Sequence, residues 1–140
     1  MGSRYRQAVG IDAEWRELAA ALRSLANDAE LADAENAFGV LEKGLALLFE
    51  ALGRIGHPVP CEDRKLAIRQ LLEGAFESSI LGLIPGDATV SGIRVGTDRA
   101  SAQVALAGKG VHQSNLAKTL ALGWFAALAR SLAHILEEAA

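Results

Sequence analysis

Between Leu31 and Ile55, apolar residues follow one another at alternating steps of three and four. This is the a/d spacing of a helix that packs against another helix along a single seam. The seam residues are Leu31, Ala34, Phe38, Leu41, Leu45, Leu48, Leu52 and Ile55. Small residues at positions 37, 44 and 51 form a second row beside the seam, where a neighbouring helix could approach closely. A helix over this stretch would be about 37 Å long, which favours an extended helical hairpin or a partner chain.

A similar seam in residues 12–27 predicts another helix. The two seams differ in phase near Asn27 and Asp28, residue types that favour turns and helix caps. We therefore expect helices over 12–27 and 30–55 that fold back as an antiparallel hairpin. One long helix with a stutter is the alternative. A glycine and two prolines in residues 56–60 end the second helix.

The second half of the chain predicts two more helices around a β-hairpin. A third helix is expected from Glu62 to about Leu83, and a mostly apolar last helix from Leu116 to about Glu138. Between them, residues 88–95 and 100–106 flank a four-residue turn signal, which is typical of a hairpin.

The hairpin needs further support, because two strands alone are marginally stable. Either Arg4–Ile11, whose residues alternate as in a short strand, or a strand from another chain is expected to complete the sheet. Gly92 interrupts the alternation of the first strand, which predicts a β-bulge.

These elements predict an α+β, predominantly helical fold in the order helix, helix, helix, β-hairpin, helix, with a short N-terminal strand as an option. Of 140 residues, 51% are hydrophobic and 22% are charged, which is typical of one globular domain over residues 1–140. Met1–Ser3 resemble a remnant of cloning and are set aside.

Cysteine content and hydropathy predict a cytoplasmic protein. Cys61 is the only cysteine, so no disulfide can form within the chain. The charge-free run between Lys118 and Arg130 is too short for the ~20 apolar residues of a membrane-spanning helix. The N-terminus has no apolar segment typical of a signal peptide. No membrane association is expected.

The long seam, the apolar last helix and the unfinished sheet exceed what one small domain can readily bury. We therefore expect a non-enzymatic assembly or interaction module, with a homodimer favoured and another protein as an alternative partner. The predicted interface residues are Phe38, Leu41, Leu45, Leu48, Leu52, Trp124 and Leu128.

A winged-helix DNA-binding regulator is one alternative function. The order helix, hairpin, helix fits it, and Arg94, Arg99 and Lys109 would make the wing basic. The net charge of −3 and the apolar third helix argue against nucleic acid as a partner.

A small-ligand or anion binder is the other alternative. A glycine-rich segment opens the last helix, and its polar residues Lys109, His112, Ser114 and Asn115 could hold an anion. The segment lacks the spacing of a P-loop or a dinucleotide fingerprint.

No cofactor, metal or catalytic residue is predicted. His57, Cys61, Glu62 and Asp63 lie close together in sequence, but no second His/Cys pair stands at metal-ligand spacing. Helix capping already accounts for the two acids.

Overall fold

The computed structural model describes residues 2–140, with side chains described from Ala13 onward; Met1, part of the suspected cloning remnant, lies outside the described residues. The elements are α1 (Gly2–Leu31), the 3-10 helix η1 (Ala34–Asn36), α2 (Ala37–Arg54), α3 (Cys61–Leu72), α4 (Phe76–Leu81), β1 (Thr89–Arg94), β2 (Ala100–Ala105), β3 (Val111–Ser114) and α5 (Leu120–Ala139). The described chain is 61% helical with a small antiparallel sheet, which confirms the predicted α+β, mostly helical fold.

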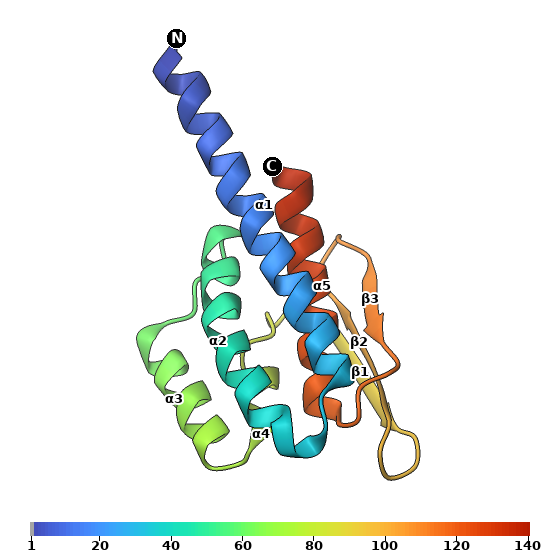
Figure 1. Cartoon of the computed structure of the whole chain (residues 1–140). Coiled ribbons are helices and arrows are strands. Elements are labelled where there is room, and N and C mark those ends of the chain that lie inside the picture. Colours follow the sequence, from blue (N-terminus) through green and yellow to red (C-terminus); the bar gives the residue numbers. More distant parts are fainter. Residues whose placement is uncertain (1) are drawn as a thin grey trace.

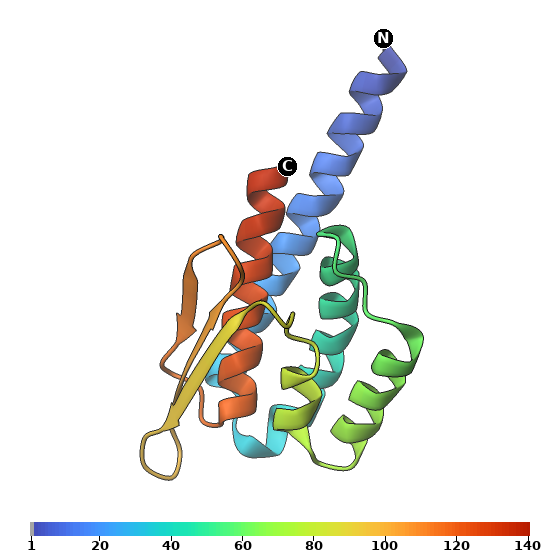
Figure 2. The same ribbon diagram turned by 180° about the vertical axis from the view of Figure 1, so that it is seen from behind.

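Helix α5 lies at the centre of the molecule (Figures 1 and 2). The long helix α1 runs antiparallel beside it, α2 and α4 also contact it, and the sheet packs against it from the other side. Of its 20 residues, 13 are buried. A helix that is apolar nearly all round can be stable only in such a position.

The junction between α1 and α2 is a turn, and it comes later than the seams suggested. Helix α1 continues to Leu31, and the extended backbone of Asp33 (φ −75°, ψ 163°) interrupts the helix. Leu31 is 80% exposed, whereas Ala32 is buried and continues the first seam. Arg4–Ile11 belongs to α1, so the option of an N-terminal strand is wrong.

The predicted seam of α2 is buried from Leu41 to Leu52, and the row of small residues beside it is buried as well. A Cβ atom added to Gly44 would lie 2.4 Å from the Phe125 ring of α5. The glycine therefore permits the close approach that its position in the sequence indicated. The loss of helix propensity at Gly44 is offset by packing.

The predicted third helix is two helices, because the chain turns at residues 73–75. Gly74 has a φ of +83°, a left-handed conformation that only glycine adopts at low cost. The short α4 then packs back on α3, where the buried Ser79 hydroxyl donates a 2.7 Å hydrogen bond to the carbonyl oxygen of Ala67.

The sheet has three antiparallel strands in the order β1-β2-β3. Gly92 pairs in register with Ala102, so the predicted bulge is absent from the described hairpin. A Cβ atom at Gly92 would lie 2.8 Å from Leu120 and 3.0 Å from Trp124. Close packing on α5 therefore accounts for this glycine.

The third strand comes from residues that were expected to form only a connection. Strand β3 pairs with β2 across a turn in which Gly108 and Gly110 have positive φ angles. As a result, α5 begins at Leu120 instead of Leu116, and the Thr119 side chain caps it by accepting a hydrogen bond from the Leu122 amide.

Helix α5 is the one described helix whose length and composition would allow it to cross a membrane. In this fold, 72% of its apolar window is buried inside the protein. The core helix of a soluble domain has the same property.

Candidate functional site

The predicted interface residues lie in the core of the chain itself. Leu41, Leu45, Leu48, Leu52 and Leu128 are buried, as is most of Trp124. Phe38 is half-buried and packs on Phe76, with 6.5 Å between ring centroids. This burial corrects the assignment of these residues to an interface, because the chain's own helices already cover them.

Part of the exposed apolar surface lies instead on the outer face of the sheet. Strand β2 alternates between buried and accessible residues, and its register with β1 and β3 defines one face toward α5 and one away from it. We call the face that points away from α5 the open face. It consists of Thr89, Ser91, Ile93, Ser101, Gln103, Ala105, Val111 and Gln113.

None of these open-face side chains in the described strands carries a charge. Ile93 is 68% exposed and Val111 is 64% exposed. Between them, Gln103 accepts a 3.4 Å hydrogen bond from the Ser91 hydroxyl and donates one of 3.4 Å to the Gln113 side chain. The open face is therefore a neutral surface with a polar row in the middle and exposed β-branched residues at either end.

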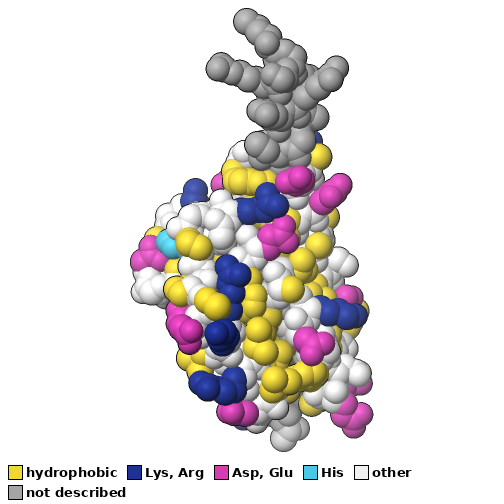
Figure 3. Space-filling model, turned by 90° about the vertical axis from the view of Figure 1, so that its left-hand side faces the viewer, with side chains coloured by type: hydrophobic (Ala, Val, Ile, Leu, Met, Phe, Trp, Pro, Cys, Tyr) yellow, Lys and Arg dark blue, Asp and Glu magenta, His cyan; other side chains and the backbone are white. Residues whose placement is uncertain are grey.

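Helix α3 also exposes apolar side chains, but its surface is strongly charged. Leu66, Ile68 and Leu72 are exposed. The charged residues of the same helix are Glu62, Asp63, Arg64, Lys65 and Arg69. Figure 3 shows the side of the molecule that carries α3, where basic and acidic side chains interrupt the hydrophobic patches. Such mixing is typical of a solvated helix face.

The residues of the predicted anion site do not converge. Lys109 lies in the β2–β3 turn, while His112 and Ser114 alternate onto the side of β3 that faces α5. Asn115 points elsewhere and accepts a 2.7 Å hydrogen bond from Ser101. Strand pairing separates these side chains, since neighbouring residues of a strand face opposite ways.

The residues of the predicted DNA-binding wing are also separated. Arg94 and Arg99 line a hollow of about 140 Å³ near Lys118, whereas Lys109 lies at the other turn of the sheet. Arg94 pairs with Glu77 at 2.9 Å. Helix α3, which lies within the predicted third helix that a winged-helix protein would use to contact DNA, packs on α2 and α4. No common basic surface joins α3 and the hairpin in the described chain.

A polar network that sequence alone did not indicate joins α1, β3 and α5. Glu30 forms an ion pair with Arg130, and the buried Ser114 hydroxyl donates a 2.7 Å hydrogen bond to the Glu30 carboxylate. Arg130 also donates to Asn27 at 3.0 Å. The hydrogen bond from Arg130 outweighs partial burial and lowers the pKa of Glu30 below its usual 4.5. The network holds the sheet to the helical layer.

Two histidines face each other nearby, with 5.4 Å between their ring centroids. His112 is partly buried and its Nδ1 atom has no hydrogen-bond partner, while His134 lies 3.0 Å from Glu138. Burial, together with the neighbouring His134 and Arg23, lowers the pKa of His112 below 6.5. The His112 imidazole is therefore neutral near pH 7 and packs against His134.

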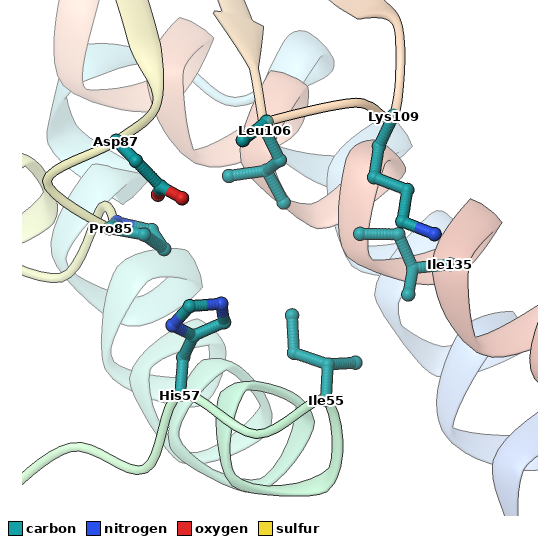
Figure 4. A pocket seen from close by; sticks show the side chains of 8 residues that line it. Ile55, His57, Pro85, Asp87, Leu106, Lys109 and Ile135 are labelled. Carbon is teal, nitrogen blue, oxygen red and sulfur yellow. The ribbon is translucent and has the colours of Figure 1, made fainter.

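His57 and Asp63 border a hollow of about 370 Å³. His57 also lines a second, smaller cavity to which Cys61, Glu62 and Asp63 do not contribute. The cavity has a volume of about 90 Å³, and its other polar lining residues are Asp87 and Lys109 (Figure 4). Cys61 is exposed. Among the residues with described side chains, no group of three or more His, Cys, Asp or Glu is arranged to hold a metal ion.

Comparisons of the chain with protein-family models, with curated proteins and with solved structures found no match. Its function is therefore inferred from its own residues and their geometry.

Proposed function

We propose that this chain is a non-enzymatic interaction module of the cytoplasm that forms a homodimer through the open face of its sheet. The supporting observation is that the open face has no charged side chain although Ile93 and Val111 are well exposed. Charged residues are depleted at the cores of protein interfaces, whereas solvated surfaces are rich in them.

A second copy of the chain is the partner that this surface suits best. A two-fold interface brings the same patch of both subunits together, so the patch must be complementary to itself. A neutral face meets this requirement without repulsion between like charges. Ser91, Gln103 and Gln113 carry both donors and acceptors, so they can pair with the same residues of a second copy.

The size of the open face sets the expected affinity. Two strands of six residues and one of four cover a footprint of about 250 Å² at the usual strand spacing and rise. Specific dimers of standard size bury about 800 Å² on each partner. The dimer is therefore expected to be weak, with a dissociation constant on the order of micromolar or higher.

Sedimentation equilibrium over a range of concentrations tests the proposal. The full chain should show a reversible monomer–dimer equilibrium. Ile93→Glu should weaken association at least about 100-fold, because each subunit would bury a new charge. Leu72→Glu on α3 is the matched control, since Leu72 and Ile93 are each 68% exposed. It should leave the dissociation constant unchanged within about twofold.

Circular dichroism of both variants confirms that the fold is retained before association is compared. A chain that stays monomeric at the highest concentration tested would refute the proposal. A dimer that Leu72→Glu disrupts and Ile93→Glu does not would place the interface on α3 and refute the role of the open face.

A further inference from the structure

The cavity beside His57 is bordered by residues from four parts of the chain. His57 follows the end of α2, Asp87 precedes β1, Lys109 lies in the β2–β3 turn, and Ile135 belongs to α5. Figure 4 shows the Asp87 and His57 side chains on one side of this space and the Lys109 side chain on the other, where it runs beside Ile135. The apolar lining includes Leu106 and Ile135. A cavity with few polar groups on an apolar lining is typical of a small-molecule site.

Two opposite charges border this cavity without neutralising each other. Asp87 and Lys109 line the same space, and Figure 4 shows them on opposite sides of it. Among the residues with described side chains, neither takes part in an ion pair within 4.0 Å. A ligand with one charge of each sign could satisfy both, whereas a simple anion would be attracted by Lys109 and repelled by Asp87.

The volume limits the size of such a ligand. The cavity of about 90 Å³ corresponds to roughly three water molecules at about 30 Å³ each. A cavity of roughly 150 Å³ can hold benzene, so this smaller space suits a compact molecule of at most about six non-hydrogen atoms. The apolar wall contributed by Leu106 and Ile135 is suited to a methyl group.

We propose that this cavity binds a small zwitterionic α-amino acid of about the size of glycine or alanine. Its ammonium group pairs with the Asp87 carboxylate and its carboxylate pairs with the Lys109 ammonium group. The His57 imidazole offers a further hydrogen bond through a ring nitrogen. The site is separate from the open face and does not depend on the dimer.

Backbone amide chemical shifts of the nitrogen-15-labelled full chain test the proposal during titration with L-alanine. Saturable shifts are expected at Asp87 and Lys109, with a smaller or no response to acetate and to ethylamine, which each carry one of the two charges. Asp87→Asn and Lys109→Met should each weaken alanine binding about tenfold, the loss expected for one charge-assisted hydrogen bond.

The matched controls are Asp98→Asn and Lys118→Met, which make the same chemical changes in another hollow of the surface. They should leave the dissociation constant for alanine unchanged within about twofold. Absence of saturable shifts with tens of millimolar alanine would overturn the proposal. Equal binding of acetate and alanine, insensitive to Asp87→Asn, would also overturn it by indicating a simple anion site at Lys109.

Discussion

Helices α5 and α3 are both rich in apolar residues, yet they occupy opposite situations in the molecule. Helix α5 buries 13 of its 20 residues between the helical layer and the sheet. Helix α3 buries only Ala67 and Leu71 and leaves three large apolar side chains exposed. The difference follows from charge, because α5 has a single charged residue, Arg130, before its last turn, whereas α3 has five in twelve residues.

The contrast indicates that the content of leucine and isoleucine alone does not determine how deeply a helix lies in this fold. A charged side chain is buried at high cost unless it is paired, so the charges of α3 keep it at the surface. The one charged residue in the middle of α5, Arg130, is satisfied by Glu30. The stability of the domain should therefore depend far more on α5 than on α3.

The largest expected effect comes from truncating the same side chain in the two helices. Leu128→Ala should lower the free energy of unfolding by about 2–5 kcal/mol, because Leu128 is fully buried and the chain around it cannot collapse completely. Leu72→Ala in α3 should change it by no more than about 0.5 kcal/mol. Urea unfolding followed by circular dichroism measures both. Similar losses in the two variants would contradict the contrast between the helices.

A smaller effect is expected where α2 meets α5. Gly44→Ala should destabilise the protein by about 1–3 kcal/mol, because the new methyl group would overlap the Phe125 ring. Gly53→Ala in the same helix is the control, since a Cβ atom there has no neighbour within 4 Å. It should stabilise the protein by up to about 1 kcal/mol through helix propensity. Thermal unfolding of both variants distinguishes close packing from propensity.

A pH-dependent effect is expected at the polar contact of α5. The pKa of Glu30 is lowered in the folded state, so its contribution to stability is present above pH 4.5 and is lost as the pH falls through the folded pKa. Glu30→Gln should therefore be less stable than the parent near neutral pH and should lose less stability on acidification. Urea unfolding at a series of pH values measures the difference. Parallel pH profiles for the two proteins would contradict this role of Glu30.

Acidification should begin to lower the stability of the wild-type protein at a pH above the range in which Glu30 titrates, because of His112. Its pKa is lowered in the folded state, so the unfolded chain binds the proton more readily and stability falls as the pH drops below about 6.5. This decline should persist in Glu30→Gln, which separates the two groups.

Periodicity predicted the parts of the fold that depend on one helix or one hairpin. The seam from Leu41 to Leu52 is buried as expected, and Gly44 allows the expected close approach. Strands β1 and β2 lie within the predicted segments. These features follow from local spacing, since residues three or four apart share one face of a helix and residues two apart share one face of a strand.

Features that depend on contacts distant in sequence could not be predicted in the same way. The short strand β3 is stabilised by its pairing with β2 and its packing on α5, and its four residues show little strand signal alone. The missed signal was the pair of glycines at positions 108 and 110, a turn between two pairing segments. The interface prediction was wrong for a related reason: a seam does not specify which helix covers it, and here α1 and α5 do so.

The candidate sites were predicted less completely than the fold. The sequence suggested Lys109 only as a candidate anion-binding residue, and Asp87 and His57 come from other loops that folding brings to the same cavity. The open face was missed because its neutrality becomes visible only when the register joins residues from three strands.

The fluorescence of Trp124 reports whether strand β1 stays packed on helix α5. Its N–H group donates a 3.0 Å hydrogen bond to the carbonyl oxygen of Ser91 in β1, and the ring is almost fully shielded from solvent. Any detachment of β1 from α5 would expose this ring to water and shift its fluorescence emission to longer wavelength. Since the chain has only two tryptophans, replacing Trp15 by phenylalanine would leave a single fluorophore that reports on this strand.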